Sequence, residues 1–177
     1  GDHRDLHVRS RRQRQMCIRD SSNEGGWHSR SIENVDLLPE DMRNVFNTMV
    51  IEFDKAIEYC RTSAGFPPLK LQNFWINING PGAYHTLHNH QDSLLSGVFY
   101  IDIPLEGMGD LQFYRGDDAQ YYIPDNLSSY NTITSTMATY PPKPGMLVIF
   151  PSWVKHAVKQ NRTDAERIAI SFNYGAK

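Results

Sequence analysis

The chain of 177 residues has only two cysteines, Cys17 and Cys60. Two cysteines do not support the disulfide framework of a small secreted domain. Long apolar runs are also missing, because no stretch approaches the roughly 20 residues that cross a bilayer as a helix. No apolar segment follows the basic start, as a signal peptide would require. We therefore expect a soluble, cytoplasmic protein that does not act at a membrane.

An excess of positive charge is absent as well. The chain has 18 Lys and Arg against 20 Asp and Glu, which gives a formal net charge of -2. Without a basic field, the composition gives no indication of nucleic acid as a partner. Hydrophobic residues make up 40% of the sequence, which is enough for one domain with a sizeable core.

The first 21 residues differ from the rest of the chain, because they hold six of the 18 basic residues. A basic run of this kind is typical of a nucleic-acid-binding arm or of a disordered tail. Residues 11–21, RRQRQMCIRDS, resemble a translated sequencing adapter found in assembled environmental sequences. We therefore expect residues 1–21 to be a non-native, disordered tail, and residues 22–177 to be a single domain that is truncated at its N-terminus.

Hydrophobic periodicity predicts one helix followed by many short strands. Between residues 36 and 60 the apolar residues recur at helical spacing, and Pro39 suits the first turn. The predicted stripe consists of Phe46, Met49, Val50, Phe53, Ile57 and Cys60. The predicted strands are residues 74–79, 95–103, 111–114, 146–150 and 167–172, and residues 116–138 form a long loop with a hairpin. One helix and several strands at this spacing favour a β-sandwich or barrel.

Three histidines predict a metal site. His88 and His90 are two residues apart in a segment with strand character, so their side chains point the same way. His156 follows the apolar run 146–150, which we expect to deliver a third ligand at the end of a strand. Neutral imidazoles bind Fe, Zn, Cu or Ni. The set His90, Asp92 and His156 is an alternative that spacing alone does not exclude, although we favour the three imidazoles. His85, three positions from His88, is expected to face the other way.

A second set of residues predicts a carboxylate site. Arg167, Ala169 and Ser171 share one face of the last predicted strand, and guanidinium binds carboxylate in a bidentate manner. Tyr100 can add a hydroxyl donor, and Asn77 completes the predicted co-substrate-binding set with Arg167, Tyr100 and Ser171. The alternative for Arg167 is an ion pair at a sheet edge, with Glu166 or Asp164.

Several motifs together resemble one known family. They are Trp75-Ile76-Asn77-Ile78-Asn79, Gly82, His88-Asn89-His90, Ser96-Gly97-Val98-Phe99-Tyr100, Phe150-Pro151-Ser152-Trp153, His156 and Glu166-Arg167-Ile168. This combination is similar to the 2-oxoglutarate/Fe(II) oxygenases of marine bacteria and their phages. The resemblance implies a mainly β fold, a double-stranded β-helix (a cupin-like jelly roll) with an N-terminal flanking helix. It implies that the catalytic metal site is His88, His90 and His156, and that Arg167 binds the far carboxylate of 2-oxoglutarate with help from Tyr100.

The activity implied by the resemblance is the oxidation of a second substrate by O2, with decarboxylation of 2-oxoglutarate to succinate. The second substrate would be a small molecule or a side chain. A cupin-type metal-binding barrel that does not use 2-oxoglutarate is the main alternative, since the spacing of Gly82, His88, His90 and His156 fits cupin motifs in part. Cupins place a glutamate where this chain has leucine. A third hypothesis is a metal-free carbohydrate- or partner-binding jelly roll that uses Trp75, Trp153 and Tyr84.

Overall fold

The computed structural model describes residues 22–117, 121–124, 126–131 and 133–176, so the predicted tail at residues 1–21 lies outside the described residues. The described chain forms two antiparallel five-stranded sheets, ordered β1-β4-β9-β6-β7 and β2-β3-β10-β5-β8. The strands are β1 (Asn23–Glu24), β2 (Trp27–His28), β3 (Leu69–Asn79), β4 (Tyr84–His88), β5 (Leu95–Asp102), β6 (Leu111–Tyr114), β7 (Met137–Tyr140), β8 (Leu147–Pro151), β9 (His156–Val158) and β10 (Arg167–Ala176). A mainly β fold of two facing sheets is what the sequence predicted.

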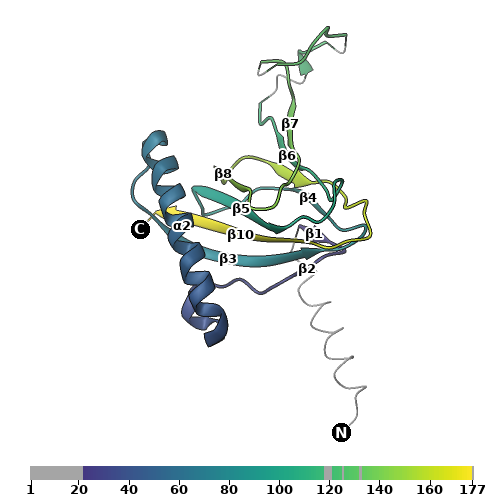
Figure 1. Cartoon of the computed structure of the whole chain (residues 1–177). Helices are drawn as coiled ribbons and strands as arrows, with labels where there is room; N and C mark the ends of the chain where they lie inside the picture. Colours follow the sequence, from purple (N-terminus) through teal and green to yellow (C-terminus); the bar gives the residue numbers. More distant parts are fainter. Residues whose placement is uncertain (1–21, 118–120, 125, 132, 177) are drawn as a thin grey trace.

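The predicted helix is α2 (Glu40–Ala64), preceded by a short 3-10 turn, η1 (Val35–Leu37). It lies across the outer face of the sheet that contains β3 and β10 (Figure 1). The predicted apolar stripe makes this contact: the Phe53 ring stacks on Phe172 with centroids 4.4 Å apart, and Phe46 stacks on Phe74 at 5.3 Å. Each fully buried ring of this kind contributes about 1.5–3 kcal/mol. The main apolar core therefore lies between the helix and the outer face of the sheet.

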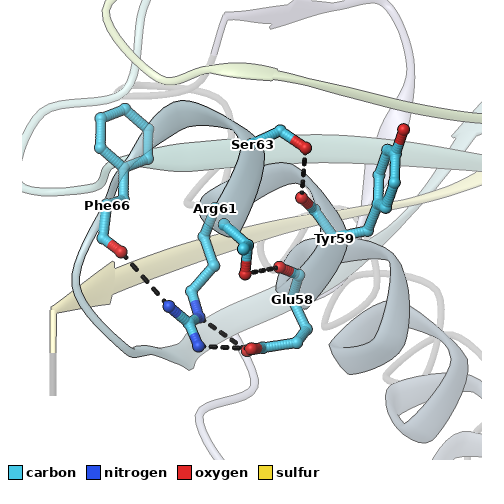
Figure 2. Close-up of polar contacts among 6 residues, drawn as sticks. Glu58, Tyr59, Arg61, Ser63 and Phe66 are labelled. Atoms are coloured by element: carbon cyan, nitrogen blue, oxygen red, sulfur yellow. Dashed lines mark hydrogen bonds and ion pairs between the residues drawn. The ribbon is translucent and has the colours of Figure 1, made fainter.

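The helix ends where its backbone turns into the left-handed region at Gly65, whose φ is 72°. The N–H groups of Gly65 and Phe66 then bond to the carbonyls of Thr62 and Arg61, at 3.2 and 2.9 Å, in a Schellman arrangement. Figure 2 shows that the Arg61 side chain also joins Glu58 and the carbonyl of Phe66 at this end. These contacts fix where the chain leaves the helix and enters β3.

Strand β10 is the central strand of its sheet, paired with β3 on one side and β5 on the other. Alternation along β10 sends Ile170 and Phe172 outward to the helix, and Arg167, Ala169 and Ser171 inward, as predicted. The ladder to β3 extends over the whole of both strands, from Arg167 to Ala176, with one register shift between Asn173 and Tyr174. For this reason β3 and β10 are longer than the apolar runs that predicted them.

The predicted long loop connects β6 and β7, which pair as a hairpin. In Figure 1 the described parts of this connection project from the body of the molecule beyond β7. None of the described residues between β6 and β7 lines the cavity that is discussed below. The strands β1, β2 and β9, of two or three residues each, were not predicted, because such short segments carry no periodicity.

Candidate metal and co-substrate site

The three predicted histidines come together between the sheets. His88 is the last residue of β4 and His156 is the first residue of β9, and the two are direct partners in the β4–β9 ladder. Their ring centroids are 4.2 Å apart, and the His90 ring lies 5.2 Å from His88 and 5.1 Å from His156. One nitrogen from each ring falls within 4.8 Å of the others. This spacing allows all three imidazoles to bind a single metal ion.

Two details of the prediction were wrong, although the rings converge. His156 does not end the strand of residues 146–150; it opens β9, in the opposite sheet, after a turn. His90 lies two residues beyond the end of β4, so strand alternation does not aim it. Instead, its backbone N–H donates to the Ser152 carbonyl at 2.9 Å. The turn after β8 therefore holds His90 in place.

The tautomers of two imidazoles follow from their neighbours. The Nδ1 atom of His88 lies 2.7 Å from the Thr86 carbonyl, and that of His156 lies 2.9 Å from the Val154 carbonyl. A carbonyl only accepts, so Nδ1 carries the proton in both rings and Nε2 keeps its lone pair. The Ser22 hydroxyl, 3.2 Å from Nε2 of His88, is placed to donate to that lone pair. Backbone carbonyls commonly orient metal-binding histidines in this way.

Electrostatics keep the three imidazoles uncharged. Burial, with a smaller effect of the neighbouring imidazoles, lowers the pKa of His90 to about 3 and the pKa of His156 to about 4. Burial also lowers the pKa of His88. Near neutral pH all three rings are therefore neutral, with one nitrogen free of a proton, which is the form that binds a metal.

Asp92, the alternative ligand, is exposed on the turn after His90 and is absent from the described metal-binding cluster. Its backbone has a φ of 63°, so the extended geometry that would have placed residues 88, 90 and 92 on one face has already ended. The arrangement thus favours the three imidazoles over the set with Asp92.

Arg167 is only 3% exposed and lines the cavity that the histidines line. Its Nη1 donates to the carbonyls of Met108 at 3.0 Å and Gly109 at 2.9 Å, and its Nη2 donates to Oδ1 of Asn79 at 3.1 Å. Three of the five N–H donors of a guanidinium are thereby used. The buried Nε has no partner in the described structure. Among the described ion pairs there is none to Glu166 or Asp164, so the edge-strand alternative is not what the structure shows.

The cavity has a volume of about 380 Å³, and the other predicted co-substrate residues also line it. Asn77 is 3% exposed, and its Nδ2 donates to the Ser171 hydroxyl at 2.9 Å while its Oδ1 has no partner. Tyr100 is buried beside them. Burial raises the pKa of Tyr100 to about 12, so its hydroxyl stays a neutral donor. The structure therefore brings together every residue of the predicted set.

His85 was expected to face away from His88, and this was wrong. In the β4–β9 ladder His85 pairs with Val158 and His88 pairs with His156, so three positions on β4 match two on β9. The extra residue is a β-bulge, which reverses the alternation and turns both rings to the same side. His85 lines the cavity, and its ring centroid is 6.4 Å from that of His88.

Asn79 is a cavity residue that the sequence did not single out. It belongs to the motif of residues 75–79 and shares a strand face with Asn77 and Trp75, but neither signal gave it a role. Strand position does not show whether a polar side chain is exposed or buried, and only the packing of the two sheets shows that Asn79 is completely buried.

The aromatic residues proposed for a carbohydrate-binding face are not brought together. Trp75 lines the cavity, with its ring centroid 5.8 Å from that of His90. Trp153 is 55% exposed and Tyr84 is 40% exposed, and neither lines the cavity. Leu95, where a cupin could carry its glutamate ligand, is buried in the apolar core under α2. Of the three aromatic residues, Trp75 alone lines the cavity.

The fold and the family agree with this chemistry. A family model described as "Putative 2OG-Fe(II) oxygenase" matches residues 73–173, more than half of the chain. The protein belongs to this family of 2-oxoglutarate- and Fe(II)-dependent oxygenases, enzymes with a double-stranded β-helix fold. The matched residues contain all three histidines and Arg167, so the predicted family and fold are confirmed. No curated protein sequence matches the chain.

Solved structures show the same fold at low sequence identity. A prolyl-4-hydroxylase from Pseudomonas putida superposes with a TM-score of 0.60 at 16% identity, over 98% of this chain and 86% of that one. A prolyl hydroxylase from Trichoplax adhaerens, in complex with a hypoxia inducible factor peptide, gives a TM-score of 0.62 at 16% identity, over 86% and 63%. HygX from Streptomyces hygroscopicus, with nickel and 2-oxoglutarate bound, gives 0.58 at 15% identity, over 96% and 78%. The chain spans 43% of the length of an oxidoreductase of the 2OG-Fe(II) oxygenase family from Burkholderia pseudomallei.

Among the described residues, no helix combines the length and the apolar character that crossing a bilayer requires.

Proposed function

We propose that His88, His90 and His156 bind Fe(II), and that Arg167 binds the far carboxylate of 2-oxoglutarate in the same cavity. The observation that carries this proposal is the pairing of two features: three neutral imidazoles within 4.8 Å of one another, and a buried guanidinium with an unpaired Nε that lines the same cavity. A buried, unpaired cationic donor is costly, and a carboxylate ligand removes that cost.

The residues around Arg167 fit a slender dicarboxylate. Ala169 follows Arg167 on the inner face of β10 and pairs with Asn77 on one side and Tyr100 on the other. Its methyl group leaves room for the carbon chain of 2-oxoglutarate between the guanidinium and the metal. The Tyr100 hydroxyl adds a donor to the far carboxylate.

Asn77 and Ser171 join the same carboxylate site. 2-Oxoglutarate carries only hydrogen-bond acceptors, so a donor must face it. A half-turn of the Asn77 amide presents its NH2 group to the cavity, while the Ser171 hydroxyl donates to Oδ1. The amide oxygen that is unpaired in the described structure then gains a partner.

The three-imidazole set differs from the usual two histidines and one carboxylate of non-heme iron oxygenases. All three ligands are uncharged, so the bound ion keeps its full double charge. The near carboxylate of 2-oxoglutarate would then meet a site of net charge +2, where a carboxylate ligand would leave +1, and would be attracted more strongly. When bound, the metal and 2-oxoglutarate supply O2 activation, with release of succinate and CO2, for the oxidation of a second substrate.

We propose that the second substrate binds beside Trp75 and His90, whose neighbouring rings both line the cavity. We propose that this substrate is a small molecule or a peptide side chain, and that the enzyme acts in the cytoplasm. Cys60, a free cysteine on α2, agrees with a reducing compartment. Nucleic acid and membrane are not among the proposed partners, because the chain is slightly acidic.

The test is turnover of 2-oxoglutarate by the purified full chain with added Fe(II), ascorbate and O2. We expect succinate to form slowly even without a second substrate, and expect chelation of the metal to abolish it. Arg167→Ala should raise the KM for 2-oxoglutarate by on the order of a hundred-fold, because a buried charged hydrogen bond is worth about 2–4 kcal/mol. Metal binding without any interaction with 2-oxoglutarate would contradict the proposal and favour the cupin-type alternative.

A further inference from the structure

Asn79 lies directly opposite Arg167 in the β3–β10 ladder and is completely buried. Its Oδ1 accepts a hydrogen bond from Nη2 of Arg167 at 3.1 Å. The same oxygen lies 3.3 Å from Nε2 of His85, which is the ring that the β-bulge turns into the cavity. Asn79 thus joins the guanidinium to a wall residue on the opposite sheet.

The side chain and the backbone of Asn79 are each held by a further hydrogen bond. Its Nδ2 donates to Oδ1 of Asn23 at 2.8 Å, and its backbone carbonyl accepts from Nδ2 of Asn161 at 3.0 Å. Because Asn23 takes the NH2 end, the oxygen end must face Arg167 and His85. The side-chain amide therefore has one favoured orientation, set by Asn23 of β1, while Asn161 holds the backbone.

This orientation determines which N–H groups of Arg167 remain available to a ligand. The two carbonyls of Met108 and Gly109 use both N–H groups of Nη1, and Asn79 uses one N–H of Nη2. The Nε–H group and the second N–H of Nη2 are left. Gly109 is also required here, since its φ is +93° and an added Cβ would lie 2.1 Å from the Lys159 carbonyl oxygen. Three fixed acceptors thus hold the guanidinium plane.

All three acceptors are uncharged, and this matters as much as their positions. No carboxylate is among the described hydrogen-bond partners of Arg167. The positive charge is therefore stabilised by dipoles without being neutralised, and it stays available to an anionic ligand. An aspartate at position 79, which has nearly the same shape, would form an ion pair with Arg167 and compete with that ligand.

We propose that Asn79 is a positioning residue for 2-oxoglutarate: it orients Arg167 through a neutral hydrogen bond and so presents a charged, pre-aligned donor pair to the far carboxylate. This inference rests on the proposed function of Arg167. It adds that the specificity for a dicarboxylate depends on a residue that does not itself need to touch the ligand.

The experiment compares Asn79→Ala and Asn79→Asp in the full chain, with the KM for 2-oxoglutarate and the kcat at saturation measured separately. We expect Asn79→Ala to raise the KM on the order of ten-fold, and Asn79→Asp to raise it more, on the order of a hundred-fold, with kcat changed by less than about two-fold. A merely structural role would lower the active fraction, and therefore kcat, while the KM stayed constant.

A matched ligand sharpens the comparison. 2-Oxopentanoate has the length of 2-oxoglutarate but lacks the far carboxylate, so its weak competitive inhibition should be almost unaffected by Asn79→Asp. If Asn79→Asp weakened the binding of both ligands equally, the inference would be overturned, because the effect would then not depend on the far carboxylate.

Asn73→Ala is the matched protein control. Asn73 lies on the same strand as Asn79, and its side chain accepts a hydrogen bond from Asn173 of β10 at 3.0 Å, but it does not line the cavity. We expect Asn73→Ala to lower the Tm and leave the KM unchanged; a KM as high as that of Asn79→Ala would contradict the inference.

If Asn79→Ala does not fold, the near-isosteric Asn79→Asp decides alone. A wild-type chain that fails to bind 2-oxoglutarate refutes the proposed function, whereas an active wild type with an unchanged Asn79→Asp variant refutes only the role of Asn79.

Discussion

His88 and His156 face each other across the β4–β9 ladder, with ring centroids 4.2 Å apart and with each Nδ1 bonded to the carbonyl two residues earlier in the chain. The ladder sets the separation of the two rings, and the carbonyls set their tautomers. This pair is therefore preorganised for a metal, while the third ring, His90, depends on the turn after β8.

Removal of one member of the pair tests the metal site. We expect His156→Ala to weaken the binding of Ni²⁺ or Fe(II) by at least a hundred-fold, because only two of the three imidazole ligands remain. Isothermal titration with the metal alone measures this directly. His28→Gln is the control, since His28 lies outside the imidazole cluster, and equal loss in both variants would contradict the assigned ligands.

The stability of the metal-free protein should fall as the pH is lowered. The folded-state pKa values of His90 and His156, about 3 and about 4, lie below the ordinary value of 6.5. Below pH 6.5 the unfolded chain therefore binds more protons than the folded one, which favours unfolding. Each histidine costs up to about 1.4 kcal/mol per pH unit from about 6.5 down to its folded pKa.

Urea denaturation at pH 7.5 and pH 5 measures this loss. A double variant, His90→Gln with His156→Gln, should show a smaller difference between the two pH values. The prediction fails if the free energy of unfolding is the same at both pH values in the wild type.

The space beside Arg167 can be closed by one substitution. Ala169→Leu adds three carbons between Asn77 and Tyr100 on the inner face of the sheet. We expect it to abolish 2-oxoglutarate binding and to leave metal affinity within about three-fold, because His88 and His156 lie on the other sheet. Titration of the nickel-loaded protein with 2-oxoglutarate separates the two effects. Ala138→Leu, on the exposed strand β7, is the control and should bind 2-oxoglutarate normally.

The anchor of His90 can be weakened through Ser152. The Ser152 hydroxyl is completely buried and lies 2.7 Å from that of Ser96, which in turn donates to Asn173 at 2.7 Å. We expect Ser152→Ala to lower the free energy of unfolding by about 1–2 kcal/mol, because it breaks a buried hydrogen bond. Metal affinity should fall with it, since the Ser152 carbonyl holds the His90 backbone.

Thermal unfolding and nickel titration of the same samples measure both effects. Ser63→Ala removes a hydroxyl that bonds the Tyr59 carbonyl on the exposed side of α2, and it should change neither quantity noticeably. A Ser152→Ala protein with wild-type metal affinity would show that the turn does not depend on this hydroxyl.

Features that depend on residues close together in the chain could be predicted from the amino-acid sequence alone. The apolar stripe of α2 predicted both the helix and its buried face, and alternation along β10 predicted that Arg167, Ala169 and Ser171 share a face. The spacing of His88 and His90, with His156 after an apolar run, predicted a metal cluster. The predictions for α2 and β10 are confirmed, because helical and strand periodicity fix the direction of each side chain from its position in the chain. Metal binding by the three histidines, whose rings converge, stays a prediction.

Other features of the site became visible only in the folded structure. The β-bulge that turns His85 toward His88, the strand change that places His156 opposite His88, and the turn that removes Asp92 all depend on pairing between distant segments. The burial of Asn79 and its bond to Arg167 likewise need β3 and β10 side by side. Such contacts join residues up to 88 positions apart, and no local pattern encodes which neutral partner a buried charge will find.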